Sequence, residues 1–530
     1  MPPRVPAAID LPLEARFVLS RLVLILGVLL PTVVAGQAPT PFRVEEATIT
    51  DIHAAMRQGR IDCHGLVRTY LQRIERVDPA INSLIVVNSR ALDVADSLDR
   101  QYRSSGMIGP LHCVPVIVKD NFQTTDLPTT AGSLSFAGWV PRRDAFMVRR
   151  LREAGAIILA KSNMAEFAFT PYETVSSILP GYTRNPYALD RVTAGSSGGT
   201  AAAVAASLGA VGLGTDTGNS IRGPSSHQAL VGIRSTMGLT SRAGVVPLIL
   251  ASDIAGPMAR TVADAVAVFQ VVVGEDPADP VTSAAHDHPA PDYSRSLRPD
   301  GLRGTRLGVL RQAYERPSTD SAILDLFGGA LDDLRRAGAE IVDPATIPGL
   351  DSLLRIATGA CNPFKHDINA YLDALGADGP PVRSLTDIVR SGRFHPTIQR
   401  RLEQADLVAA TPEDTPGCQA RDRFRAALRT AVLGVMDSLR LDAFVYPTWS
   451  NPPRLIGDLN TPHGDNSQLF SPSTGFPSIN VPMGYTRGNT LPAGLTLYGR
   501  PWDEATLIRL AYSYEQTTHH RRPPPLANSP

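Results

Sequence analysis

Residues 194–222 read AGSSGGTAAAVAASLGAVGLGTDTGNSIR, and this stretch decides how the chain is interpreted. Two short glycine-rich segments, each containing serine, flank a segment made almost entirely of Ala, Val and Ser. The small side chains of residues 200–208 predict a helix that can pack closely against a sheet, and residues 211–214 predict a strand. A tight turn, a helix and a strand that enters a second tight turn therefore follow one another here.

The preceding sequence continues this alternation. An apolar run at residues 114–118, rich in β-branched side chains, ends directly in Lys119 and Asp120, and it predicts a strand buried on both faces. Residues 145–154 then predict a helix, and residues 156–160 predict the next buried strand. Strands that alternate with helices indicate an α/β fold with parallel strands in a layered sheet.

Lys119 is the first residue with chemical significance. An ammonium group at the end of a buried strand is costly unless it is paired. Burial lowers the pKa of a lysine, and the neutral amine can then act as a base near neutral pH. The structural alternative is a lysine that reaches solvent or forms an ion pair with Asp120. The two serine segments favour the catalytic interpretation.

Ser220 and Ser196 supply the other parts of such a site. A nucleophile needs backbone N–H donors beside it to hold a developing oxyanion, and the tight turn at residues 217–220 can provide them. A hydroxyl placed between a base and a nucleophile can relay a proton, which is the role expected for Ser196. The alternatives are an ordinary turn at Ser220 and a helix N-cap at Ser196 or Ser197. Together the three side chains predict a serine hydrolase that uses lysine as its base.

A competing hypothesis places the nucleophile at Ser197. Residues 195–199 match the G-x-S-x-G pattern of the α/β-hydrolase nucleophile elbow, which predicts an esterase. That motif should follow a strong strand, but residues 188–193 form a poor strand pattern. The hypothesis also leaves Lys119 and the second serine segment without a role.

Composition narrows the function classes. The chain has 530 residues, 43% of them hydrophobic, so it can bury a large core. Lys and Arg balance Asp and Glu at 51 each, which gives no reason to expect a nucleic-acid partner. Residues 1–38 contain a basic region, a short apolar run and small residues, as in a signal peptide. We therefore expect export to the periplasm or medium, with an uncleaved membrane anchor as the alternative.

Cysteine and histidine do not indicate a metal site. Cys63, Cys113, Cys361 and Cys418 include no C-x-x-C pair, and the histidines form no ligand set. Export would permit two disulfides, with three possible pairings, and buried free thiols are the alternative. His112 and His227 could line the active site, although packing is the simpler role for each.

Taken together, these motifs resemble the amidase signature family, the serine hydrolases with a Ser-Ser-Lys triad. The resemblance covers most of the chain after residue 38. Its motifs lie at residues 70–74, 109–112, 118–121, 154–168, 194–199, 214–222, 231–236, 256–262, 477–482 and 494–497.

The resemblance implies an α/β/α fold with a large mixed central sheet flanked by helices. It implies that Ser220 is the nucleophile, that Lys119 is the general base, and that Ser196 is the bridging serine in a cis peptide bond. It implies an oxyanion hole formed by the backbone N–H groups of Thr217, Gly218, Asn219 and Ser220, with Ser197, Asp216 and Arg222 supporting the site. It implies acyl transfer through an acyl-enzyme, with no metal or cofactor.

Two residues depart from the family pattern at the site. Asn219 occupies a position where glycine is frequent, and its side chain could narrow or polarise the oxyanion region. Cys113 follows His112 where glycine is usual, and it could crowd the approach to Lys119. Neither departure removes a catalytic residue, so activity is expected.

The chain is thus expected to hydrolyse linear C–N amides, with aryl amides, fatty amides, peptide amides and carbamates as candidate substrates. A homologue that binds an amide without turnover is the second hypothesis. The expected organisation is an amidase domain at residues 39–518, with residues 301–440 shaping the pocket, and a disordered tail at 519–530. Phe364, Tyr371 and Trp449 are candidate pocket aromatics. The expected partner is a small-molecule amide or carbamate, and a homodimer is possible. No stable membrane contact is expected unless the N-terminal segment stays uncleaved.

Overall fold

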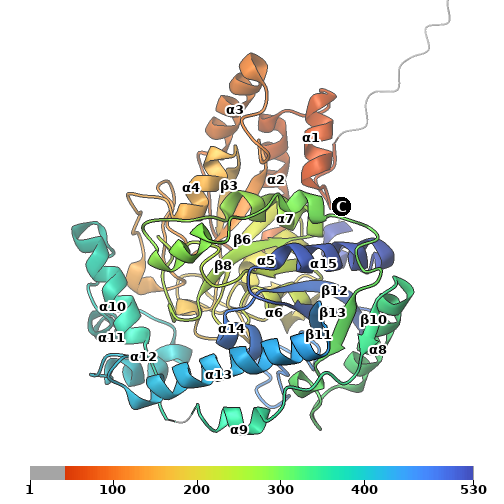
Figure 1. Ribbon diagram of the computed structural model, residues 1–530. Coiled ribbons are helices and arrows are strands. Elements are labelled where there is room, and N and C mark those ends of the chain that lie inside the picture. The colour runs from red at the N-terminus through yellow and green to blue at the C-terminus, as the bar shows by residue number, and fades with distance from the viewer. Residues whose placement is uncertain (1–41, 358, 529–530) are drawn as a thin grey trace, which may run out of the picture. The chain divides into compact units, whose positions relative to one another are not determined.

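An eleven-stranded mixed sheet forms the centre of the protein in the computed structural model, which describes residues 42–357 and 359–528 (Figure 1). The predicted signal peptide lies outside the described residues. The strands of this sheet are β1 (Leu84–Val87), β2 (Pro115–Lys119), β3 (Ile157–Ser162), β6 (Val211–Asp216), β7 (Val231–Arg234), β8 (Ile254–Ala259), β9 (Arg306–Val309), β10 (Glu340–Val342), β11 (Ala443–Pro447), β12 (Ser478–Thr486) and β13 (Leu491–Tyr498). The large mixed sheet that the resemblance implied is confirmed.

The strand order is β1-β3-β2-β6-β8-β7-β12-β13-β11-β9-β10. Strand β2 lies parallel to both β3 and β6, as the strand–helix alternation predicted. The central strands β8, β7, β12 and β13 pair antiparallel, and β11, β9 and β10 are again parallel. Every residue of β2, β3, β6 and β8 is buried, which explains why their sequences are continuous apolar or small-residue runs.

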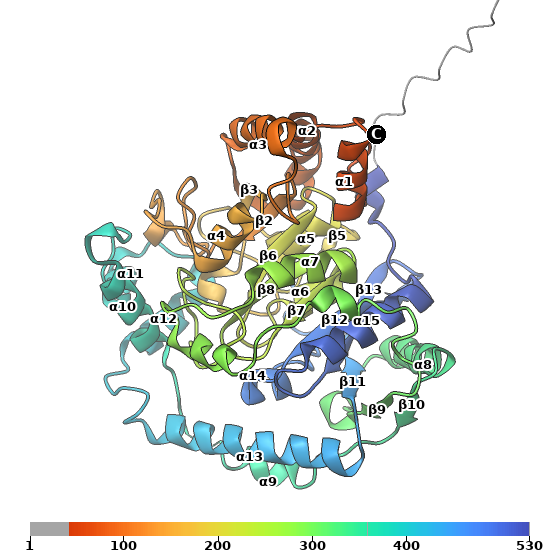
Figure 2. The ribbon, with the colours of Figure 1, turned by 45° about the horizontal axis from the view of Figure 1, so that its top comes forward.

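Helices pack against both faces of this sheet. They are α1 (Ile49–Arg57), α2 (Cys63–Ile81), α3 (Ala91–Ser105), α4 (Phe146–Glu153), α5 (Gly198–Ala205), α6 (Arg222–His227), α7 (Val262–Val272), α8 (Ser321–Arg336), α9 (Leu350–Leu354), α10 (Phe364–Leu375), α11 (Leu385–Ser391), α12 (Gln399–Asp406), α13 (Pro416–Ser438), α14 (Phe470–Thr474) and α15 (Glu504–Thr518). Helices α5 and α6 contact each other and the sheet, while α7 contacts α4 and α15. The segment α10–α13 lies on the side away from α1–α3 (Figures 1 and 2).

Close approach between α5 and β6 follows from the small-residue sequence. A Cβ atom added at Gly212 of β6 would lie 2.5 Å from the Thr200 methyl carbon of α5, so only glycine fits. All eight residues of α5 are buried, because the helix is covered by the sheet on one side and by α6 and neighbouring segments elsewhere. This packing places the two serine segments at the two ends of one helix–strand unit.

Two other sequence expectations are refined by the structure. Residues 188–193 contain a strand after all, β5 (Ala188–Val192), but it pairs only with β4 (Arg184–Asn185) in a separate two-stranded sheet. The segment expected to be a disordered tail is described as far as Asn528, and Arg521 forms an ion pair with Glu46 at 2.7 Å. The Arg521 side chain is only 12% exposed, so this pair holds the segment against the body of the protein.

The four cysteines form two disulfides, so the structure selects one of the three possible pairings. Cys63 is joined to Cys113, and Cys361 is joined to Cys418. The first bond links the beginning of α2 to the segment that enters β2, and Cys113 has a left-handed φ of 63°. The second bond links the segment before α10 to the first turn of α13. Within the described ranges, no helix has both the length and the apolar character needed to cross a membrane.

The Cys63–Cys113 bond should contribute strongly to stability. It spans 50 residues of sequence, so it restricts the unfolded chain considerably. We expect the Cys63→Ala/Cys113→Ala variant to lose about 2–5 kcal/mol of unfolding free energy, measured by urea denaturation. The double variant Cys361→Ala/Cys418→Ala serves for comparison, because it removes the other disulfide, which spans a similar length of 57 residues. An unchanged unfolding midpoint in the Cys63/Cys113 variant would contradict this prediction.

Candidate active site

The Lys119 side chain is buried among hydroxyl groups. Its Nζ atom donates hydrogen bonds to Ser196 Oγ and Thr215 Oγ1, each at 2.7 Å. Within residues 42–357 and 359–528, Lys119 forms no ion pair, and its exposed fraction is 0%. Burial lowers the pKa of Lys119 to about 7, although the more distant charges of Asp253 and Asp216 oppose the shift. A lysine in this state can act as a base near neutral pH.

The ion pair between Lys119 and Asp120 that the sequence allowed does not form, because Asp120 pairs with another lysine. Asp120 follows Lys119 in the chain and points to the other face of the sheet, where it pairs with Lys161 of β3 at 3.3 Å. Lys161 Nζ also donates to the carbonyl oxygens of Phe122 and Pro128. The carboxylate of Asp120 therefore neutralises Lys161 and leaves the Lys119 amine to the hydroxyl groups.

Ser196 lies in a tight turn that holds it against Lys119. The Gly195–Ser196 peptide bond is cis, as the resemblance implied. A Cβ atom at Gly195 would lie 2.4 Å from the Glu173 carbonyl oxygen, so the turn requires glycine there. The Ser196 carbonyl oxygen accepts a hydrogen bond from Ala165 N at 3.0 Å. The backbone on both sides of Ser196 is thus fixed by neighbouring segments.

Ser197 has a structural position. It is the N-cap residue of α5, is fully buried, and exchanges hydrogen bonds through its Oγ with the backbone of Thr215 at 3.2 and 3.3 Å. This contact connects the first serine segment to the end of β6. Ser197 does not line the cavity described below, and the strand that precedes its turn, β5, is not part of the central sheet. The geometry therefore does not favour the nucleophile-elbow hypothesis.

The second serine segment is organised around Asp216, the last residue of β6. Its carboxylate accepts hydrogen bonds from the backbone N–H groups of Ile221 and Arg222 and from the guanidinium groups of Arg222 and Arg234. All three charged side chains are fully buried. Burial by itself would raise the pKa of Asp216, but the two arginines outweigh it and lower the pKa to about 2. The loop between Asp216 and Arg222 is therefore closed on itself by charge-assisted hydrogen bonds.

Asn219 also has a defined partner. Its Nδ2 donates to Asp465 Oδ1 at 2.9 Å, and Gln468 Nε2 donates to Asp465 Oδ2 at 2.9 Å. Burial raises the pKa of Asp465 to about 6. The side chain at this position, where glycine is frequent in the family, thus anchors the loop to the segment before α14.

Ser220 lies at the wall of a cavity of about 550 Å³. Thr217, Gly218 and Asn219 line the same cavity, so the whole loop expected to form the oxyanion hole faces it. The remaining lining residues are Ala168, Phe169, Pro171, Tyr172, Leu248, Ile249, Ser252, Ala357, Arg401, Arg421, Phe424, Arg425, Gln468, Pro472 and Ser473. Five of these come from the segment 301–440, all of them after residue 350, while the first part of that segment forms β9, α8 and β10.

The candidate pocket aromatics named from the sequence have other positions. Phe364 packs in a core cluster, Tyr371 accepts a hydrogen bond from Gln123, and Trp449 stacks on His227 with ring centroids 4.6 Å apart. The aromatic residues that line the cavity are Phe169, Tyr172 and Phe424. His227 is buried, and burial lowers its pKa to about 3, so it is a neutral packing residue.

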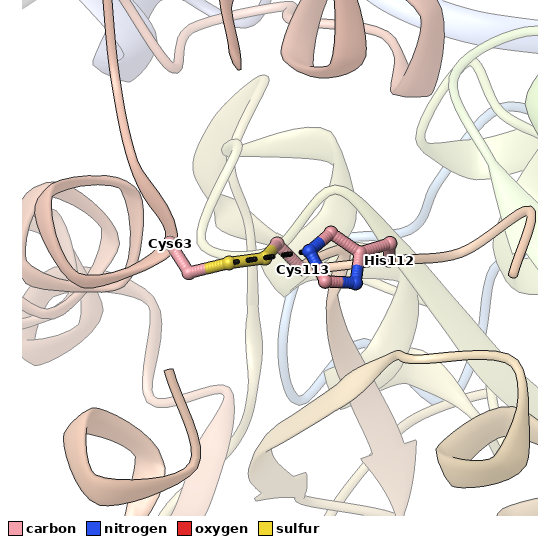
Figure 3. A group of neighbouring side chains, drawn as sticks. All are labelled: Cys63, His112 and Cys113. Atoms are coloured by element: carbon pink, nitrogen blue, oxygen red, sulfur yellow. Dashed lines mark hydrogen bonds between the residues drawn. A yellow bond between two sulfur atoms is a disulfide. The ribbon is translucent and has the colours of Figure 1, made fainter. Parts of the chain in front are cut away.

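His112 lies beside the first disulfide rather than at the cavity. Cys63, His112 and Cys113 approach one another closely, and such a set of side chains could in principle bind a metal ion (Figure 3). The two sulfur atoms are bonded to each other, however, so neither is a thiolate available for coordination. His112 Nε2 lies 3.9 Å from Cys63 Sγ and packs against the bond.

Thr215 and Asn121 were not singled out by sequence reasoning. Thr215 Oγ1 accepts hydrogen bonds from Lys119 Nζ and from Asn121 Nδ2 at 3.1 Å, so these residues orient the amine. Both lie within motifs already identified: Asn121 directly follows Lys119-Asp120, and Thr215 directly precedes Asp216. Arg234, the second partner of Asp216, lies within the motif at residues 231–236, but its contact with Asp216 was not predicted, because Arg234 lies on β7 and reaches Asp216 only in the folded sheet.

Comparisons with known proteins agree with this arrangement. The amidase family model matches residues 65–508. A probable amidase of Arabidopsis thaliana is 37% identical over an alignment of 506 residues that covers 91% of this chain and 92% of that protein. A glutamyl-tRNA(Gln) amidotransferase subunit from Myxococcus xanthus is 34% identical over 488 residues, covering 89% of this chain and 98% of that protein.

The solved structures include a peptide amidase from Stenotrophomonas maltophilia. It is 36% identical and superposes with a TM-score of 0.81, covering 91% of this chain and 99% of that chain. The family match spans the strand that carries Lys119, both serine segments and most of the central sheet. This chain therefore belongs to the amidase signature family, whose members include hydrolases that act on amides.

Proposed function

We propose that this protein hydrolyses linear amides through an acyl-enzyme formed on Ser220. The observation that carries the proposal is the 2.7 Å hydrogen bond between Lys119 Nζ and Ser196 Oγ, at a lysine that burial brings to a pKa of about 7. A neutral amine in contact with a buried hydroxyl is the arrangement needed to draw a proton from a serine nucleophile.

The proposed reaction moves protons through Ser196. Ser220 Oγ attacks the amide carbonyl carbon as its proton passes to Ser196, while the Ser196 proton passes to the Lys119 amine. The backbone N–H groups of residues 217–220 stabilise the oxyanion. The C–N bond then breaks as the proton returns along the same route to the leaving amine. Water cleaves the acyl ester by the reverse sequence and regenerates Ser220.

The substrate range is proposed from the relatives and the cavity. Peptide amides are the first candidates, because a 36% identical relative is a peptide amidase. Aryl amides, fatty amides and carbamates remain candidates, since the same serine chemistry serves each. Membership of a larger assembly is the alternative suggested by the amidotransferase relatives. The balanced charge of the chain gives no support for tRNA binding.

We also propose that the protein is exported. The two disulfides support this localisation, because such bonds persist in oxidising compartments. Intact-mass analysis of secreted protein tests the proposal: a mature chain that begins near Ala38 is expected. Protein that remains in the cytoplasm with its full N-terminus would contradict it.

Substitution of the nucleophile gives a direct test of the proposed mechanism. We expect Ser220→Ala to lower turnover of a chromogenic anilide, carbamate or ester by roughly 10⁴–10⁶-fold, because the acyl-enzyme cannot form. Lys119→Ala and Ser196→Ala should each cause losses of several orders of magnitude. A fluorophosphonate probe should label the wild-type protein but not the Ser220→Ala variant.

Ser197→Ala is the matched control for this experiment. It should retain labelling, because the Ser197 hydroxyl bonds to the Thr215 backbone and lies away from the cavity. Labelling that survives Ser220→Ala but is lost in Ser197→Ala would instead support the esterase hypothesis. Binding of amides by a wild-type protein that neither turns over nor labels would support a non-catalytic homologue.

A further prediction concerns the pH dependence of kcat/KM. Only neutral Lys119 can accept a proton, so kcat/KM should rise with pH along a limb centred at about 7, and then level off. Asp253 raises the pKa of Lys119 through its negative charge. The Asp253→Asn variant should therefore move the limb to lower pH.

Asp325→Asn is the control, because Asp325 is an exposed residue of α8 and does not line the cavity. The position of the limb is the readout, since Asp253 also contacts Thr217 and its loss can change the maximal rate. A limb near pH 10, or a shift to higher pH in Asp253→Asn, would contradict the role of Lys119 as the base.

A further inference from the structure

One part of the cavity wall is strongly basic. Arg401 of α12 and Arg421 and Arg425 of α13 line the cavity that contains Ser220. Arg421 and Arg425 are four residues apart on one helix, so they lie on the same face, one turn apart. No Asp or Glu is among the described residues that line this cavity.

The positive charge of this wall is only partly neutralised within the protein. Arg421 Nη1 donates to the Cys361 carbonyl oxygen at 3.4 Å, and Arg401 donates to the Phe169 carbonyl oxygen. Neither forms an ion pair with another described residue. Arg425 pairs with Asp422 at 3.3 Å, but the Asp422 carboxylate is largely exposed, so the attraction is screened by water.

A buried carboxylate behind the cavity wall, that of Asp253, already has its own partners. Asp253 accepts hydrogen bonds from the backbone N–H groups of Leu248 and Ile249 at 2.8 and 3.0 Å and from the Thr217 hydroxyl. The adjacent residue, Ser252, accepts a hydrogen bond from Arg425 Nη2 at 2.8 Å. Arg425 is thereby held next to the segment that contacts the loop of Ser220.

Helix α13 is fixed in a way that positions both arginines. Cys418 lies one turn before Arg421 and is bonded to Cys361, the residue whose carbonyl oxygen Arg421 contacts. Phe424 lies between the two arginines and is 4% exposed, so it anchors this face of the helix in the protein. These contacts fix the helix that carries both arginines, and Arg421 and Arg425 each have a hydrogen-bond partner beside the cavity.

We propose that the cavity binds amides that carry a carboxylate, and that Arg421 and Arg425 bind this carboxylate while Arg401 adds to the positive field. Guanidinium groups form charge-assisted, often bidentate hydrogen bonds with carboxylates. The described lining of the pocket has no acidic residue, and the carboxylates of Asp253 and Asp465 behind it already accept hydrogen bonds from the lining residues Thr217, Asn219 and Gln468. The inference rests on the proposed function, since it names the class of amide that Ser220 would cleave.

Binding to the Ser220→Ala protein tests the proposal without turnover. Two matched pairs place the charge on either side of the amide: glutaric acid mono-4-nitroanilide with its methyl ester, and 4-acetamidobenzoate with its methyl ester. Calorimetry should show that the acid of at least one pair binds about tenfold more tightly than its ester, as expected for a hydrogen-bonded charge. Equal affinities within both pairs, or no binding by either acid, would overturn the proposal.

Variants on α13 locate the site. Arg421→Gln/Arg425→Gln, in the Ser220→Ala background, should reduce the acid-to-ester affinity ratio to near one. Arg423→Gln is the matched control, because Arg423 is an exposed arginine of the same helix and does not line the cavity. A ratio that persists in the double variant would overturn the assignment to these residues, provided that thermal unfolding shows all variants to be folded.

Wild-type turnover of the same compounds separates this inference from the proposed function. Hydrolysis of acid and ester at equal rates, with equal binding, would retain an amidase and reject the carboxylate site. Preferential binding of the acid with no hydrolysis of any compound would retain the carboxylate site and reject the proposed function.

Discussion

The active-site side of the sheet depends on the buried cluster of Asp216, Arg222 and Arg234. One carboxylate and two guanidinium groups are removed from water together, and their mutual hydrogen bonds offset much of the cost, although Arg222 Nη1 and Arg234 Nε have no hydrogen-bond partner among the described residues. Arg222 also donates to the Gly218 carbonyl oxygen at 2.6 Å, and Arg234 donates to the Ser252 carbonyl oxygen at 2.9 Å. The cluster therefore joins the end of β6, the loop of Ser220, the end of β7 and the segment before β8.

The buried lysines Lys119 and Lys161 have different partners. Burial lowers the pKa of Lys161, but the Asp120 carboxylate opposes this shift, and two carbonyl oxygens accept hydrogen bonds from its ammonium group. Lys119 donates to two hydroxyl groups, which do little to offset the cost of burying its charge. The difference arises because Lys119 and Asp120 are adjacent in the chain at the end of one strand and must point to opposite faces. Strand geometry thus separates the potential base from the nearest acid.

The cavity is lined by two different parts of the fold, and both lie within the residues that the family model matches. The loop of residues 217–220 follows β6 of the central sheet. The arginines come from α12 and α13, a segment in which the sequence analysis found none of the family motifs. The proposals made above thus assign bond cleavage and substrate selection to different parts of the fold, as is common where binding elements surround a rigid scaffold.

Much of the fold and the catalytic hypothesis followed from the sequence alone. Short-range patterns identified the strand before Lys119, the small-residue helix and the two serine turns, because each is encoded by neighbouring residues. Strand–helix alternation predicted parallel strands, and the resemblance to the amidase signature family implied the large mixed sheet and the roles of Lys119, Ser196 and Ser220. The candidate aromatics Phe364, Tyr371 and Trp449 show the limit of this reasoning, since an aromatic side chain packs equally well in a core.

Only the tertiary structure decided which groups meet across long stretches of chain. It paired Asp120 with Lys161, brought Arg234 to Asp216, selected the Cys63–Cys113 and Cys361–Cys418 disulfides, and placed Arg421 and Arg425 in the wall of the cavity that contains Ser220. These partners are separated by 18 to about 200 residues, and local periodicity carries no information about such contacts. The sequence by itself therefore determined the chemistry that the chain could perform, whereas packing of the sheet and its helices determined the charges, cross-links and cavity that surround it.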